Sequence, residues 1–433
     1  MDLPSLTALR TPAGAALLSQ IGPYDPGLAL ALGARLRAQH PGNAALVASA
    51  MTQARLRTRA LGKFGPDACR MWFSTAGLEQ ASRSEVADRR AARFATLGMV
   101  PTGGGADDPI ADLGCGLGSD AFALSRAGLR VLAIERDPLT AALARANAED
   151  LGLADRVDVR VGDVTDPKVL GAVTRTCAAV FIDPARRGSG AGQAGEDRRV
   201  FDLEGWSPPW SWVLDLGCRV PALAAKVAPG IAHDAIPDGA EAEWVSVGGD
   251  VVEAVVWWGA FAAGETRGGG VRRATLLPGP HELTSAGLTT PAVAAPGRWL
   301  YEPDGAVIRA GLVGHVATAV GGWLIDPTIA YVSSDRLLPT PFATAYEVTD
   351  VLAFSLKRLR AVLRERRVGT VVIKKRGSAI QPEQLRRQLR PDGPNEAVVI
   401  LTRVAGAPTV LLARPATPEP RFRPGTSPAH RGR

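Results

Sequence analysis

Three glycines at alternate positions follow an acidic residue in the segment IADLGCGLGSD, residues 110–120. Asp112 ends an apolar run that predicts a buried strand. The turn that follows contains Gly114, Gly116 and Gly118 and leads into a helical pattern. A glycine turn between a strand and a helix lets the backbone approach a ligand closely. The segment therefore predicts a nucleotide-like ligand at a strand-to-helix turn rather than a tight turn without one.

The glycine spacing separates three classes of ligand. A phosphate loop of the GxxxxGK[ST] type is excluded because no lysine follows the glycines. A nicotinamide dinucleotide fold prefers its third glycine one position later, where this chain has Ser119. The pattern D-x-G-x-G-x-G instead matches the first motif of S-adenosylmethionine-dependent methyltransferases, whose cofactor carries cationic groups that an acidic residue stabilises. We therefore expect S-adenosyl-L-methionine as the cofactor.

Two further strand ends carry carboxylates that suit the same cofactor. The apolar run LRVLAIERD has Glu135 at its end, where a carboxylate can accept hydrogen bonds from both ribose hydroxyls, as it also does in NAD enzymes. Asp163 follows the run VDVRV and is placed to bind an adenine amino group, with a helix cap or surface carboxylate as the alternative. The expected cofactor-binding residues are Asp112, Gly114, Gly116, Gly118, Glu135, Arg136, Asp163, Val164 and Asp183.

The fourth strand, in AAVFIDPARR (residues 178–187), is expected to carry the chemistry. Asp183 and Pro184 would lie beyond its carboxyl end, where ligands bind in open α/β sheets. We predict that Asp183 orients an amino or ring nitrogen, that Pro184 stiffens the loop and that Arg186 contacts substrate. Methyl transfer needs positioning more than a covalent nucleophile. The alternative is that Asp183 only caps the loop. The tetrad Ser207-Pro-Pro-Trp resembles a catalytic motif, but we interpret it as a helix start.

These residues require alternating strands and helices, which the sequence predicts from residue 109 onward. Repeated βα units imply a parallel sheet covered by helices on both faces. Two apolar runs around Gly248-Gly249-Asp250 predict an antiparallel hairpin at the end of that sheet. The expected strands are 109–113, 130–135, 157–161, 178–183, 221–228, 243–248 and 251–258, and the expected helices between them are 119–127, 138–151 and 167–176.

The flanking segments differ in pattern. Residues 1–100 carry apolar residues at helical spacing, and Ser82-Arg-Ser-Glu85 matches a capping box. We expect a methyltransferase domain at 101–262, a linker at 263–298 with a short strand at ATLL (residues 274–277), a third unit at 299–413 and a disordered, proline-rich tail at 414–433.

Positive charge is concentrated in the third unit. Residues 357–390 contain twelve Lys and Arg against two acidic residues, a net charge of +10, whereas the whole chain has +7. Lys374, Lys375 and Arg376 end an apolar strand, and we expect them to form an exposed cluster that contacts phosphate. A solvated helix face is an equally good interpretation of the basic helix at 358–367.

The composition also bears on metal binding, cellular location and membrane association. The four cysteines form no CxxC pair and the five histidines no HxxxH pair, so we expect no metal and a reducing, cytoplasmic location. The sequence shows neither a signal peptide nor an apolar run long enough to span a membrane, so no membrane association is expected.

Five segments together carry a family resemblance that covers nearly the whole chain. The chain resembles bacterial class I S-adenosylmethionine-dependent methyltransferases that carry a C-terminal THUMP-like domain. The resemblance implies a helical N-terminal region, a Rossmann-like α/β domain with seven strands and a C-terminal α+β module related to an RNA-binding domain. It also places Gln80 in a segment near the cofactor. The segments are LEQASRSEVADRRAARF, DLGCGLGSDAFAL, IDPARR, YEPDGAVIRAGLV and VVIKKRG.

We expect a methyltransferase that modifies a base nitrogen in structured RNA, tRNA or rRNA, with the C-terminal unit binding phosphates. One alternative is an RNA-binding or assembly protein whose methyltransferase domain only senses the cofactor. Another is a methyltransferase that acts on a protein or a small molecule. The sequence specifies neither the modified atom nor an oligomeric state.

Overall fold

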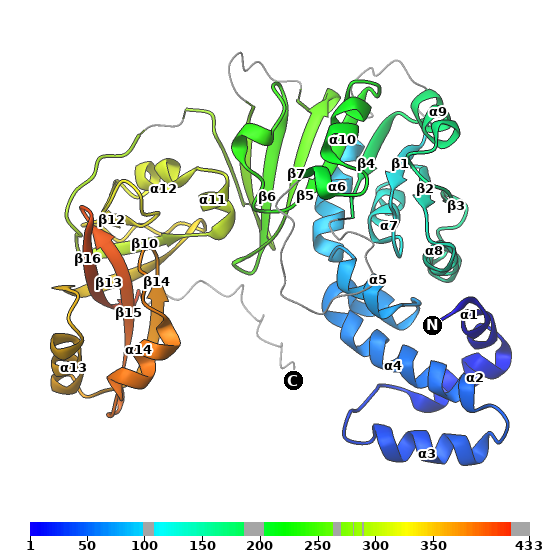
Figure 1. The fold of residues 1–433 in the computed structure, drawn as a ribbon, viewed down its shortest axis with the longest axis horizontal. Helices are drawn as coiled ribbons and strands as arrows, with labels where there is room; N and C mark the ends of the chain where they lie inside the picture. The colour runs from blue at the N-terminus through cyan, green and yellow to red at the C-terminus, as the bar shows by residue number, and fades with distance from the viewer. Residues whose placement is uncertain (98–107, 186–202, 263–269, 280, 288–289, 417–433) are drawn as a thin grey trace, which may run out of the picture. The chain divides into compact units, whose positions relative to one another are not determined.

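The computed structural model describes residues 1–97, 108–185, 203–262, 270–279, 281–287 and 290–416. The chain divides into two compact units, which are Met1–Arg273 with Leu277–Pro280 and Ala274–Leu276 with His281–Arg433. The first unit contains the helical N-terminal region and an α/β sheet, and the second is the C-terminal α+β unit (Figure 1). No helix in the described part of the chain is long and apolar enough to cross a membrane.

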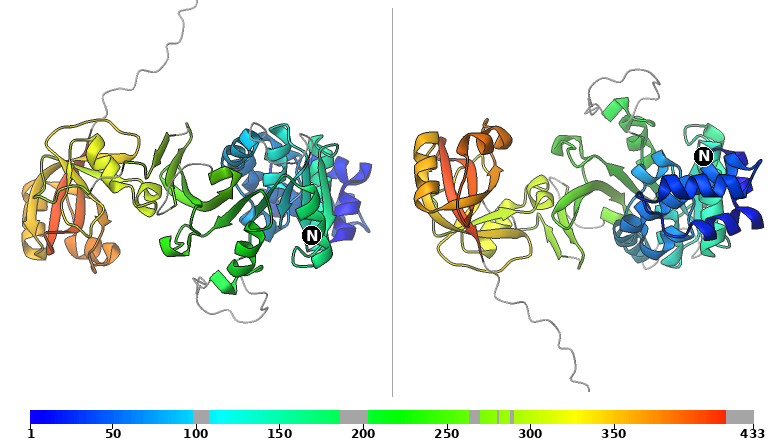
Figure 2. Two further views of the ribbon diagram at one scale, coloured as in Figure 1. Left: turned by 90° about the horizontal axis from the view of Figure 1, so that it is seen from above. Right: turned by 90° about the horizontal axis from the view of Figure 1, so that it is seen from below.

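Helices form the N-terminal region, as the apolar spacing predicts. Each buries one apolar stripe, and Leu9, Leu36 and Val47 belong to the same core as the α/β sheet. Both views of Figure 2 show these blue helices lying beside the sheet of the first unit. The region is therefore part of the α/β core and not a separate domain. Its helices are α1 (Leu3–Leu9), α2 (Pro12–Ile21), α3 (Ala29–Gln39), α4 (Ala44–Phe64), α5 (Thr75–Gln80) and α6 (Ser84–Thr96).

The α/β sheet of the first unit has the strand order β3-β2-β1-β4-β5-β7-β6. Its first five strands are parallel and alternate with helices, because each βα unit returns the chain to the same edge. The Rossmann-like domain of seven strands is confirmed. Its strands are β1 (Ile110–Leu113), β2 (Val131–Glu135), β3 (Val157–Val161), β4 (Ala179–Ile182), β5 (Ala222–Val227), β6 (Glu241–Val247) and β7 (Asp250–Gly259), and its helices are α7 (Ser119–Arg126), α8 (Pro138–Leu151), α9 (Pro167–Thr176) and α10 (Trp210–Gly217).

Strands β6 and β7 form the expected antiparallel hairpin. Gly248 and Gly249 make the turn at φ 61° and 97°, a left-handed conformation that favours glycine. The segment expected as a linker contains β8 (Arg272–Leu277) and β9 (His281–Thr284). The N–H of Ala242 in β6 donates to the carbonyl of Val271, just before β8, and the N–H of Gly248 in the turn donates to the carbonyl of Leu277 at its end. The expected strand at ATLL lies within β8, whereas β9 was missed because its four residues carry too little alternation to predict a strand.

The second unit is built on a sheet of order β11-β12-β10-β13-β16-β15-β14. Helices α13 and α14 pack their apolar stripes on one face, where Leu359, Leu363, Leu385 and Leu389 are buried. This arrangement confirms the predicted α+β module. Its elements are β10 (Trp299–Pro303), α11 (Gly305–Arg309), α12 (Val313–Ala319), β11 (Trp323–Leu324), β12 (Val332–Ser334), β13 (Ala343–Ala353), α13 (Leu356–Glu365), β14 (Val368–Lys375), α14 (Pro382–Leu389), β15 (Asn395–Val404) and β16 (Ala407–Pro415).

One boundary of this unit differs from the sequence expectation. The tail was expected from residue 414, but Arg414 pairs with Glu347 and Pro415 with Tyr346, so β16 continues through both. Residues 417–433 lie outside the described part of the chain.

Candidate active site

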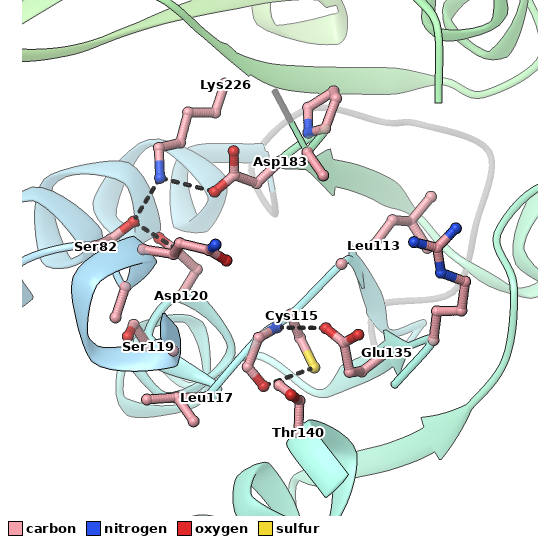
Figure 3. A pocket seen from close by; sticks show the side chains of 18 of the residues that line it. Ser82, Leu113, Cys115, Leu117, Ser119, Asp120, Glu135, Thr140, Asp183 and Lys226 are labelled. Atoms are coloured by element: carbon pink, nitrogen blue, oxygen red, sulfur yellow. Dashed lines mark hydrogen bonds and ion pairs between the residues drawn. The ribbon is translucent and has the colours of Figure 1, made fainter. Parts of the chain in front are cut away.

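A cavity of about 750 Å³ lies at the carboxyl ends of the parallel strands in the first unit (Figure 3). Leu113, Glu135, Asp163, Asp183 and Lys226 line it from the ends of five successive strands or the loops that follow them. In open α/β sheets this edge is where ligands bind, and the volume is typical of a small-molecule site.

The glycine loop lines the cavity with two of its three glycines, Gly114 and Gly116. Their φ angles of 80° and 56° are left-handed, and a Cβ on Gly114 would lie 3.3 Å from the carbonyl oxygen of Asp183. Gly118 is not among the lining residues, in contrast to the expectation. It is the N-cap residue of α7, and a Cβ there would lie 2.3 Å from the ring of Phe122. Its requirement for glycine comes from helix packing, which sequence spacing does not distinguish from ligand contact.

Asp112 also lies elsewhere than expected, because its side chain is 1% exposed and does not line the cavity. It lies within the central strand β1, paired with Ala133 on one side and Phe181 on the other. The backbone N–H of Ala121 interacts with this carboxylate and opposes the effect of burial on its pKa. Burial raises the pKa of this carboxyl to about 7, against the opposing effect of Arg90.

Glu135 lines the cavity and holds two of its lining segments in place. One carboxylate oxygen accepts a hydrogen bond from the backbone N–H of Gly116 at 3.0 Å, and the other accepts one from Asp137 at 2.9 Å. This single side chain therefore connects the glycine loop to the start of α8. Each oxygen keeps a second lone pair that is able to accept a ligand hydroxyl. The neighbouring Arg136 also lines the cavity.

Asp163 and Val164 line the cavity after β3. The Asp163 Oδ1 atom accepts hydrogen bonds from the N–H and the hydroxyl of Thr165, at 2.8 and 2.6 Å, and these bonds lower the pKa of the carboxyl. The helix-cap alternative does not apply, because Asp166 is the N-cap of α9 and accepts from the N–H of Lys168.

Asp183 and the buried Pro184 follow β4 directly and line the cavity, as expected from the sequence. Arg186 lies outside the described residues. Ser207 and Pro208 line the same part of the cavity, because Ser207 exchanges two backbone hydrogen bonds with Ala185. Helix α10 begins directly after them, with Pro209 at its N-cap, so the helix-start interpretation agrees with the structure.

Lys226 was not predicted from the sequence, although it is close to Asp183 (Figure 3). Its ammonium donates a hydrogen bond to Asp183 Oδ2 at 2.7 Å and to the Ser82 hydroxyl at 3.3 Å. The Ser82 hydroxyl in turn donates to Asp120 Oδ2 at 2.9 Å. Ser82 is therefore not the cap of α6, whose N-cap residue is Arg83. A lone lysine in the apolar strand ALAAKV, in a chain with only six lysines, was the available sequence signal.

The same network extends into the core of the first unit. Arg90 forms ion pairs with both Asp120 and Glu253, and all three side chains are buried. Charges of alternating sign thus run from the cavity to helix α6 and strand β7. Because a buried charge is costly unless it is paired, this alternation offsets the burial of the Lys226 side chain, which is 9% exposed.

One wall of the cavity comes from the N-terminal helical region, between Ser74 and Arg83. Gln80 is among its lining residues, in agreement with the family resemblance. Lys63 of α4 fixes this wall by donating to three backbone carbonyls, those of Leu78, Glu79 and Ala81, at 2.7, 3.0 and 2.9 Å.

The cluster 374–376 in the second unit is less available for ligands than expected. The ammonium of Lys374 lies 2.5 Å from a carboxylate oxygen of Glu302, and a guanidinium nitrogen of Arg376 lies 3.9 Å from the other. Lys375 donates to Gln381 at 3.2 Å and is exposed. A carboxylate 72 residues from Lys374 in the sequence therefore neutralises part of the cluster.

Comparisons with known proteins agree with this architecture. Three families match the chain: a methyltransferase domain at residues 110–183, a THUMP domain-like family at 343–415 and a domain of unknown function at 2–60. An uncharacterized S-adenosylmethionine-dependent methyltransferase of Mycobacterium tuberculosis is 35% identical over 375 residues, which cover 83% of this chain and 95% of the relative. The chain belongs to this family of S-adenosylmethionine-dependent methyltransferases.

Two further similarities are more distant. A crystal structure from Porphyromonas gingivalis W83, described as a methyltransferase, covers 91% of this chain and 100% of its own at a TM-score of 0.68 and 22% identity, so it shows the fold alone. The 23S rRNA (uracil(1939)-C(5))-methyltransferase of Acidithiobacillus ferrooxidans is 34% identical over 130 residues, which are 29% of this chain and 26% of that enzyme.

The residues of the cavity fit the cofactor of this methyltransferase. The loop at Gly114 and Gly116 leaves room for close approach, and carboxylates at the ends of β2 and β3 suit ribose and adenine. S-adenosylmethionine supplies a methyl group that is already activated on a sulfonium. Among the described residues no group of three or more His, Cys, Asp or Glu is arranged to hold a metal.

Proposed function

We propose that this methyltransferase modifies a nitrogen of a base in structured RNA, tRNA or rRNA, in the cytoplasm. The observation that carries the proposal is the position of Asp183 and Pro184, in the cavity and directly beyond β4. A carboxylate there can accept the hydrogen of a nitrogen nucleophile and direct its lone pair, and the rigid Pro184 holds the loop. No covalent intermediate is required.

The remaining cavity residues are assigned to the cofactor. Glu135 binds the ribose hydroxyls through its free lone pairs, and Asp163 accepts from the adenine amino group. Gly114 and Gly116 provide the space for close approach, while Arg136 and Val164 line the adenosine side. Asp112 and Gly118 are not assigned to the ligand, because neither lines the cavity.

An exposed basic surface of the second unit supports RNA as the substrate. Helices α13 and α14 lie side by side, joined by a hydrogen bond from Arg360 to the carbonyl of Gln388 at 2.8 Å. Five exposed cations on them form what we call the α13–α14 surface, and none has an ion-pair partner among the described residues. They are Lys357, Arg358, Arg364, Arg386 and Arg387.

This surface replaces the cluster at 374–376 as the phosphate-binding site. A guanidinium without a carboxylate partner is free to bind phosphate, whereas Lys374 would first have to leave Glu302. The similarity to a 23S rRNA methyltransferase and to the THUMP domain-like family points to the same class of substrate.

Transfer of tritiated methyl groups onto total RNA tests the proposal. RNA from a strain that lacks the gene should be labelled by the purified protein, and RNA from the wild-type strain should not, since its sites are already methylated. Equal absence of label in both RNAs, together with labelled protein or small molecules, would refute an RNA substrate.

A further inference from the structure

Two strands bring a cation and an anion to the same point of the cavity. Strands β4 and β5 are parallel neighbours in a register that pairs Ile182 with Ala225. The residues that follow, Asp183 and Lys226, are therefore side by side, and their ion pair spans 2.7 Å. Both line the cavity at the strand ends where substrate binds.

This ion pair keeps unused hydrogen-bonding capacity. An ammonium has three donors, of which Lys226 spends one on Asp183 and one on Ser82. The third has no partner among the described residues. Only the Oδ2 atom of Asp183 is engaged within the described part of the chain, so Oδ1 is free to accept. The cavity thus presents one donor and one acceptor next to each other.

We propose that Lys226 and Asp183 together bind a lactam edge, a ring N–H beside a carbonyl, and that the nitrogen of this edge is methylated. The edge occurs in guanine, at N1 and O6, and in uracil, at N3 and O4. The Lys226 ammonium donates to the carbonyl oxygen, and Asp183 accepts the adjacent N–H. This proposal rests on the proposed function and specifies its base and atom.

The charges of the pair favour this chemistry over methylation of an amino group. As the ring N–H proton moves to Asp183 Oδ1, negative charge develops on the carbonyl oxygen, where Lys226 stabilises it. The new N–C bond then forms with the methyl carbon, and the electron pair of the broken S–C bond stays with sulfur. An amino nitrogen would instead gain positive charge as it attacks, which a neighbouring ammonium opposes.

The network behind Lys226 fixes it for this role. Ser82 holds the ammonium from the N-terminal region and is itself held by Asp120, which pairs with the buried Arg90. Lys226 therefore cannot swing away from the ring when substrate enters, so its donor is already in position before the reaction.

Identification of the methylated nucleoside tests the proposal on the full-length wild-type protein. RNA from the gene-deletion strain is labelled, digested and separated, and the label should appear in 1-methylguanosine or 3-methyluridine, which distinguishes the two bases. Label in an amino group of adenosine, cytidine or guanosine, or on a carbon, would overturn the lactam edge while leaving RNA methylation intact. Absence of label from all RNA would refute both proposals.

Lys226→Met tests the cation directly. Its kcat should fall about 100- to 1,000-fold, while the Kd for S-adenosylmethionine by calorimetry stays within about twofold, since the cofactor residues assigned above remain. Activity of Lys226→Met should rise with pH by up to about tenfold per unit, because a higher pH increases the fraction of the base whose ring N–H is already deprotonated. Lys226→Arg keeps the cation and should recover part of the rate.

The exposed Lys168→Met of α9 is the matched control and should behave as the wild type. A Lys226→Met protein with wild-type kcat, or with an unchanged pH profile at reduced kcat, would overturn the role of the cation. If Lys226→Met fails to bind cofactor, the rate of Lys226→Arg and the identity of the methylated nucleoside test the role of the cation instead.

Discussion

The buried carboxyl of Asp112 makes the stability of the protein depend on pH in a predictable direction. Its folded-state pKa is about 7 because the side chain is removed from water, whereas the ordinary value is 3.8. Between these two pH values the folded protein binds more protons than the unfolded chain. The free energy of unfolding therefore decreases as pH rises through this window, and the full cost is reached above pH 7.

The substitution Asp112→Asn removes the titration and keeps the shape. A pKa difference of this size corresponds to about 4 kcal/mol, of which about 3 kcal/mol develops between pH 5 and pH 8. We expect the free energy of unfolding of the variant, relative to that of the wild type, to increase by about 3 kcal/mol from pH 5 to pH 8. Both proteins bury a neutral polar group at low pH, so the difference between the two pH values isolates the charge.

Urea unfolding without cofactor, at pH 5 and pH 8, measures this difference, since bound ligand would add its own stabilisation. The exposed Asp155→Asn is the matched control, because its side chain is in water in both states. An Asp112→Asn protein whose stability relative to the wild type is the same at both pH values would refute the assignment of a buried, protonatable carboxyl.

Three further predictions follow from the contacts described above. Glu135→Gln removes one of the two acceptors that hold the glycine loop and α8, so cofactor affinity by calorimetry should fall about 10- to 100-fold with little change in Tm; unchanged affinity would contradict this. Lys63→Met leaves three carbonyls without their donor, so hydrogen exchange at residues 78–83 should accelerate and stability fall by about 1–3 kcal/mol; unaltered protection would show that the wall needs no clamp. Neutralising three arginines of the α13–α14 surface should weaken RNA binding and reduce the slope of log K against log salt by about 2 to 3. An equal effect of Lys374→Gln, the control, would instead indicate that phosphate binds at the cluster 374–376.

The sequence contained most of the fold because that information is local. Apolar runs and glycine turns predicted the seven strands of the Rossmann-like domain within one or two residues, and the hairpin at Gly248 was predicted from its turn. Glu135, Asp163 and Asp183 reach the cavity because each ends a strand or follows it closely, and the position of a residue relative to its own strand is also local.

The errors concern partners that are distant in sequence. Lys226 meets Asp183 only through the pairing of β4 with β5, and Lys374 meets Glu302 across the second unit. A motif shows that a position needs glycine but not why it needs glycine. Gly118 was therefore predicted to bind the ligand, although the ring of Phe122 leaves no room for a larger side chain there. Such contacts exist only in the folded protein, so local sequence patterns do not predict them.

The wall between Ser74 and Arg83 links the lifetime of the N-terminal helices to cofactor supply. A ligand that binds only when this wall is folded stabilises it by RT ln(1 + [L]/Kd), so a hundredfold excess of cofactor over Kd adds about 2.7 kcal/mol. When the cofactor is scarce, the same segment opens more often and becomes accessible to proteases. The abundance of this enzyme in the cell would then follow the concentration of its methyl donor.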